Sequence, residues 1–109
     1  MAKGHIQPGK VMPYTNSGGT TITAGTVIEF ADMIGIVLAD IGAGKSGNLA
    51  ISEVWELDKD GALAISQGDQ VYWDTVNNEV DKTNTNIPCG KAFETAAEAA
   101  ATVKVLLGF

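Results

Sequence analysis

The segment from Gln67 to Val80 reads Gln-Gly-Asp-Gln-Val-Tyr-Trp-Asp-Thr-Val-Asn-Asn-Glu-Val and predicts a complete β-hairpin. Gly68-Asp69 form a turn that leads into a strand with alternating side chains. This alternation places Tyr72 and Trp73 on opposite faces of the strand. Asn77-Asn78 tolerate the positive φ that the next turn needs, and the return strand follows. These residues are typical of turns and strands rather than of a catalytic site.

Similar signals recur along the whole chain, because turn residues appear about every ten positions between short segments rich in β-branched residues. The pattern predicts an all-β fold, a small barrel or sandwich of short antiparallel strands. The expected strands are Gly4–Gln7, Lys10–Thr15, Thr26–Phe30, Met33–Ala39, Asn48–Leu57, Gln70–Asp74, Glu79–Lys82, Gly90–Glu94 and Thr102–Leu107. The alanine-rich segment 94–101 favours a helix, but it is so short that we expect a helical turn or a loop.

Two pseudo-repeated halves are visible in the sequence. The corresponding segments are Ala24–Phe30 with Gln67–Trp73, Ile34–Asp40 with Cys89–Thr95, and Leu49–Ile51 with Val103–Val105. Two such halves could each cover the apolar face of the other. Gly35 and Gly90 lie inside strand patterns, where a bulge or a close backbone approach is the usual cause.

Length and charge limit the classes of function. A chain of 109 residues suits a single β domain, 1–109, and residues 1–9 read as a polar N-terminal arm. The seven basic residues are all lysines, and with 13 acidic residues they give a net charge of −6. We therefore expect neither nucleic acid nor an anionic membrane as a partner. Charged residues make up only 18% of the chain, which favours a surface covered by neighbours in an oligomer or an assembly. The sequence shows no signal peptide and no apolar run near the roughly 20 residues that span a bilayer.

Three motifs suggest chemistry, and the surrounding sequence argues against each of them. Ala39–Ser46 is one substitution from a phosphate-binding loop, but a strand-like sequence replaces the helix that such a loop must open. Segment 56–67 spaces like a calcium loop but lacks the bidentate glutamate at its last position. His5 and Cys89 are the chain's one histidine and one cysteine, which are too few for a zinc site. We therefore expect no enzyme activity, no catalytic residue, no cofactor and no metal.

The block Gly-Asp-Gln-Val-Tyr-Trp-Asp at 68–74 resembles a segment of the small all-β cement or decoration proteins of bacteriophage capsids. Weaker matches occur in the family's order at Gly9–Val11, Ile34–Asp40, Val54–Leu57, Gly90–Phe93 and Thr102–Val105. The family often has Val-Phe-Glu-Leu where this chain has Val-Trp-Glu-Leu. The resemblance implies a non-enzymatic β-barrel or sandwich that binds the outside of the assembled phage head and bridges neighbouring major capsid proteins.

On this resemblance we expect a structural virion protein that is made in the host bacterial cytoplasm and lies on the outer capsid surface. The expected partners are the major capsid protein and further copies of the chain, as a dimer or a trimer. The arm and the loop Thr15–Thr23 are expected to order against the shell. The expected contact residues are Lys3, His5, Gln7, Tyr14, Trp55 and Tyr72. One alternative is a virion-surface carbohydrate-binding or adhesion module, and another is a nucleotide-dependent factor suggested by Gly44-Lys45-Ser46.

Overall fold

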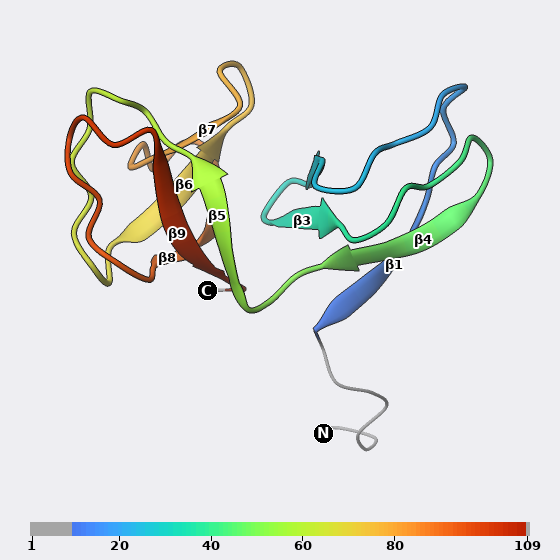
Figure 1. Cartoon of the computed structure of the whole chain (residues 1–109), viewed down its shortest axis with the longest axis horizontal. Helices are drawn as coiled ribbons and strands as arrows, with labels where there is room; N and C mark the ends of the chain where they lie inside the picture. The colour runs from blue at the N-terminus through green and yellow to red at the C-terminus, as the bar shows by residue number, and fades with distance from the viewer. Residues whose placement is uncertain (1–9, 109) are drawn as a thin grey trace.

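The computed structural model describes residues 10–108, which form two antiparallel sheets and no helix (Figure 1). The first sheet has the spatial order β1-β4-β3-β2. Its strands are β1 (Val11–Thr15), β2 (Val27–Glu29), β3 (Ile34–Val37) and β4 (Ser46–Ala50). The second sheet has the order β5-β9-β8-β6-β7. Its strands are β5 (Val54–Asp58), β6 (Gln70–Asp74), β7 (Glu79–Asp81), β8 (Ile87–Ala92) and β9 (Thr102–Leu107).

The all-β prediction is confirmed, and the two sheets do not join into one closed barrel, so a sandwich-like fold fits. The predicted strand Gly4–Gln7 lies outside the described residues. Segment 94–101 contains turns and an isolated β-bridge rather than a helix, which agrees with the expected loop.

The prediction of one strand over Asn48–Leu57 is wrong, because this segment contributes to two strands. β4 ends at Ala50, β5 begins at Val54, and the two strands belong to different sheets. Between them Glu53 has a φ of 71°, a left-handed conformation that a regular strand does not contain. The chain therefore passes from the first sheet to the second at this point (Figure 1).

The hairpin predicted at 67–80 is present as β6 and β7, with Trp73 opposite Val80. Asn78 at its turn has a φ of 54°. Val71 and Trp73 are buried and Tyr72 is only partly buried, as the strand alternation predicted. The Asp74 carboxylate fixes the turn by accepting the Val76 N–H at 2.9 Å.

The main core joins residues of both sheets. Ile34, Ile36 and Ala50 of the first sheet share one buried cluster with Val71 and Trp73 of the second. In the same region the indole Nε1 of Trp73 donates a 2.7 Å hydrogen bond to the Glu29 carboxylate of β2. A second, smaller cluster lies on the other face of the first sheet, because its residues alternate with those of the main core. Its buried members are Val37, Ile41 and Leu49.

Gly90 marks a bulge in β8, the strand that begins at Ile87 rather than at Gly90 as predicted. The pairing of β6 with β8 shifts register between Val71 and Tyr72, beside Gly90, whose φ is 154°. A Cβ at this position would lie 3.0 Å from the carbonyl carbon of Leu106, and closer still to its oxygen. The expected bulge and close backbone approach are therefore present at Gly90.

Buried polar side chains tie down the loops that follow β1 and β5. Asn16 directly follows β1 and is 3% exposed, and its side-chain amide donates to the carbonyl oxygens of Thr20 and Ile41. Lys59 directly follows β5 and is also 3% exposed. Its ammonium group donates to the carbonyl oxygens of Asp60, Leu63 and Glu98. Each sheet thus has a hydrogen-bonding side chain at the same place, where its first strand ends.

Candidate functional site

Three of the six predicted contact residues, Lys3, His5 and Gln7, lie outside the described residues. The other three are Tyr14, Trp55 and Tyr72, and each is partly buried. Tyr14 belongs to β1, where its ring packs edge to face on Phe30 at 6.2 Å between centroids. It also packs against the small cluster of the first sheet, so much of its ring has a structural role.

Trp55 and Tyr72 lie on opposite faces of the second sheet. Trp55 packs against the main core, and its Nε1 donates a 2.9 Å hydrogen bond to the carbonyl oxygen of Ser52. Tyr72 lies opposite Asp81, on the face that the buried Trp73 does not occupy. The structure therefore does not gather Tyr14, Trp55 and Tyr72 into one patch.

Five large hydrophobic side chains are exposed among the described residues, and the sequence analysis selected none of them. They are Val11, Leu38, Val54, Val76 and Phe93. The exposure of Val54 could have been predicted from the sequence, because in β5 it shares a face with the charged Glu56 and Asp58. Trp55 and Leu57, on the other face, are half-buried and buried. Exposed apolar side chains mark candidate contact sites when they gather into a contiguous patch.

Acidic side chains near the β6–β7 hairpin fix turns and repel one another. Hydrogen bonds from the Asn77 amide and the Val76 N–H lower the pKa of Asp74. The pKa of Glu79 is raised, first by partial desolvation and then by nearby carboxylates, with Asp60 the largest contributor among them. Within residues 10–108, no three His, Cys, Asp or Glu side chains form a group that could hold a metal ion. The carboxylates of this hairpin therefore fix its turn and concentrate negative charge beside it.

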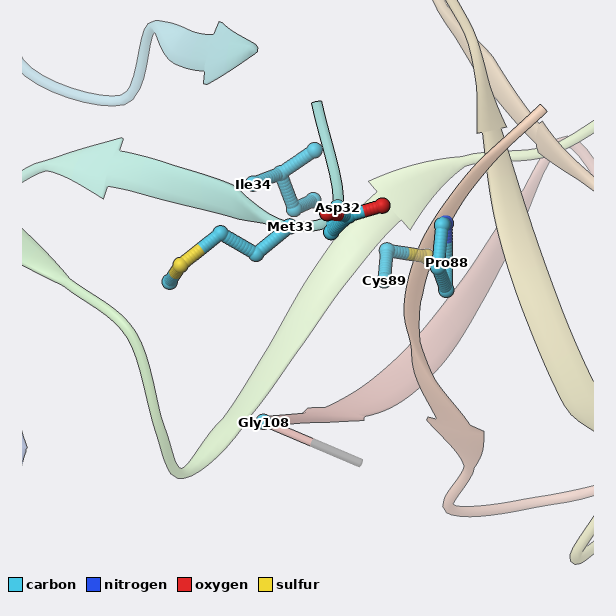
Figure 2. A pocket seen from close by; sticks show the side chains of 6 residues that line it. All are labelled: Asp32, Met33, Ile34, Pro88, Cys89 and Gly108. Carbon is cyan, nitrogen blue, oxygen red and sulfur yellow. The ribbon is translucent and has the colours of Figure 1, made fainter. Parts of the chain in front are cut away.

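A cavity of about 200 Å³ lies where the start of β3 faces β8 (Figure 2). Its lining residues are Asp32, Met33, Ile34, Pro88, Cys89 and Gly108. Cys89 is buried, and its burial raises the pKa of the thiol to about 12. A thiol that stays protonated is a poor nucleophile, so Cys89 is not activated in this cavity.

The segment resembling a phosphate-binding loop ends in a strand, as predicted. The Lys45 N–H closes a turn by donating to the Gly42 carbonyl at 2.9 Å, and β4 begins at Ser46. A phosphate-binding loop would place a helix N-terminus here. The described part of the chain contains no helix, and so none that could cross a membrane.

Comparison with protein families matches residues 6–107 to the phage cement proteins. The chain belongs to the phage cement protein family. The resemblance found in the sequence is thereby confirmed, and a cement protein is a structural component of the virion that stabilises its capsid. No curated protein and no solved structure matches this cement protein.

Proposed function

We propose that this cement protein binds the outside of the assembled phage head and adds contacts between neighbouring copies of the major capsid protein. The family match over residues 6–107 carries this proposal. A protein that binds the assembled shell, and not its separated parts, stabilises the shell by mass action and needs no catalytic group. The protonated thiol of Cys89 and the lack of a metal-binding group among residues 10–108 are compatible with such a role.

The partly buried aromatic residues are suited to such a contact. Trp55 is held by the core and by its bond to Ser52, so its remaining exposed surface is presented in a fixed orientation. Tyr72 points away from the core of the second sheet. Because rigid aromatic side chains lose little conformational entropy on binding, Tyr14, Trp55 and Tyr72 stay our proposed contacts, together with Lys3, His5 and Gln7 of the arm.

We infer that the two halves are copies of one structural module within a single β domain. The first strand of each half pairs with its last strand, as β1 with β4 and β5 with β9. The starting residues of these pairs are also alike, since Val11 lies opposite Ala50 and Val54 opposite Leu106. On the basis of these registers we pair Leu49 with Val105, two residues beyond the Val103 of the sequence comparison.

Hydrogen bonds outside the strands support the same correspondence. In the first matched pair, the Gly25 N–H donates to the Val37 carbonyl and the Gly68 N–H donates to the Ala92 carbonyl. In the second, the Ala24 N–H donates to the Asp40 carboxylate and the Gln67 N–H donates to the Thr95 hydroxyl. The β7 strand has no counterpart in this scheme, whereas β6 corresponds to β2, which makes β7 an addition to the second half.

The proposal is tested by mixing the protein with preformed heads, sedimenting the heads and then heating them. We expect the protein to sediment with the heads, as a dimer or a trimer when free, and to raise their resistance to heat. Deleting Ala2 to Gln7, which lie outside the described residues, should weaken attachment and leave the β fold intact. Protein that stays in the supernatant, or bound heads that melt no later than bare heads, would contradict the proposal.

A further inference from the structure

Four of the five exposed large hydrophobic side chains in the described chain form two matched pairs. Val11 and Val54 each begin the first strand of their sheet, and they are 37% and 39% exposed. Leu38 directly follows β3 and Phe93 directly follows β8, each of which precedes the last strand of its sheet in the chain. Leu38 is 44% exposed and Phe93 is 46% exposed. Val76, in the turn between β6 and the additional strand β7, has no counterpart in the first half.

The backbone confirms that the matched residues occupy the same places. Leu38 donates its N–H to the Asn48 carbonyl of β4 at 3.3 Å. Phe93 donates its N–H to the Lys104 carbonyl of β9 at 2.8 Å. Each exposed residue thus lies beside the last strand of its own sheet, in the same bonding position.

Other matched positions have changed with their surroundings. Ile36 is buried in the main core, whereas its counterpart Lys91 is half-buried and bonds to Gln70 at 2.8 Å. Gly47 leaves room for Ile41, whereas its counterpart Val103 is a buried core residue. Against this divergence, both exposed places remain apolar in both halves although water would favour polar residues there. The two halves therefore keep exposed apolar residues at matched places outside the core.

The first residues of β1 and β5 lie near the junction between the sheets. Lys10 and Glu53 directly precede Val11 and Val54, and their side chains form an ion pair at 4.0 Å. Figure 1 shows the start of β1 and the start of β5 on the same side of the molecule, next to the segment that links the sheets. Val11 lies opposite Ala50 of β4, and Leu38 bonds to Asn48 of the same strand. Val54 lies opposite Leu106 of β9, and Phe93 bonds to Lys104 of that strand. Each sheet therefore carries one pair, Val11/Leu38 or Val54/Phe93, with its last strand between the two residues.

We propose that these pairs are two equivalent docking sites, each for an apolar depression on one of two neighbouring copies of the same shell protein. This inference rests on the proposed function, and it identifies how one cement chain bridges two subunits. A shell of identical subunits offers the same surface repeatedly, which is the partner that two like sites on one chain fit. Once one site is bound, the second binds at a high effective concentration, so the affinity of the whole chain far exceeds that of either half.

The test uses full-length variants that replace one pair at a time with uncharged polar residues. One variant combines Val11→Thr with Leu38→Gln, a second combines Val54→Thr with Phe93→Gln, and a third combines all four changes. Val76→Thr is the matched control, because Val76 is 84% exposed and has no counterpart. Binding to purified heads is titrated by sedimentation, the melting of the heads is recorded, and circular dichroism confirms the fold of each variant.

We expect either two-residue variant to lower the apparent affinity by about 10²- to 10⁴-fold and to a similar final value, since each retains one site. Such variants should occupy heads at high concentration without raising their melting temperature, while the four-residue variant should not saturate and the control should match the natural sequence. If one two-residue variant abolishes binding and the other has no effect, the two-site inference is wrong and the proposed function stands. If the variants change only the oligomeric state of the free protein, the pairs join copies of this chain and the inference is also wrong. Failure of the unaltered protein to bind heads would overturn both proposals.

Discussion

Replacing Gly90 with alanine should destabilise the protein more than the same change at any open glycine. The added Cβ would lie 3.0 Å from the Leu106 carbonyl carbon, closer to its oxygen, and 3.1 Å from the Val105 side chain. The atom in the way belongs to the backbone of β9, so relief requires β8 and β9 to separate where Lys91 pairs with Leu106. Overpacking of this kind costs about 1–3 kcal/mol, and a φ of 154° adds strain of about 1–3 kcal/mol.

The expected loss is therefore about 2–6 kcal/mol, a large part of the roughly 5–15 kcal/mol that stabilises a typical domain. Urea titration followed by circular dichroism measures it, with two control variants. Gly25→Ala has open space but a φ of 90°, so it should cost only about 1–2 kcal/mol. Gly61→Ala has open space and no positive φ, and it should stay within about 0.5 kcal/mol of the natural protein. A midpoint for Gly90→Ala equal to that of Gly25→Ala would refute the steric argument.

Three further outcomes are expected. Trp73→Phe should lower the free energy of unfolding by about 1–2 kcal/mol through loss of the bond to Glu29. A double-mutant cycle with Glu29→Ala, which removes the acceptor, measured in urea would show no coupling if that bond contributes nothing. Cys89 should resist alkylation at pH 8 until the protein unfolds. Burial raises the pKa of its thiol from 9.0 to about 12, so the free energy of unfolding should fall as pH rises between these two values. Cys89→Ala should remove this contribution to the pH dependence of stability. Lys45→Ala should change stability and head binding by less than about 0.5 kcal/mol, and thermal stabilisation of the natural protein by ATP would contradict the loop assignment.

Sequence reasoning located strands best where alternation and turn chemistry coincide. The bounds of β6 and β9 match the predicted Gln70–Asp74 and Thr102–Leu107, because both strands alternate and are bounded by turn residues. The break inside Asn48–Leu57 was missed, since the positive φ of Glu53 reflects the change of sheet and not a residue that favours it. The early start of β8 was missed because Pro88 resembles the end of a strand, although the bulge lets it pair with Tyr72.

The candidate contact residues were less predictable than the strands. Aromatic character selected Trp55, yet much of its ring packs on the core. Phe93 looked like part of a strand, and only the fold shows that the strand ends one residue earlier and leaves it exposed. Exposure of a hydrophobic residue depends on which face its neighbours cover, and that information comes from packing between distant segments.

The order in which the chain is synthesised has a consequence that follows from the two sheets being sequential. The first sheet uses only residues 11–50, so its four strands can pair before β5 leaves the ribosome. Ile34, Ile36 and Ala50 then stay exposed to solvent until the second sheet supplies the other residues of their buried cluster. That sheet cannot be completed early, because β9 is the last strand to be made and lies between β5 and β8. A nascent chain released before Thr102 would therefore carry a finished first sheet with an adhesive apolar face, and aggregation is the fate we expect for it.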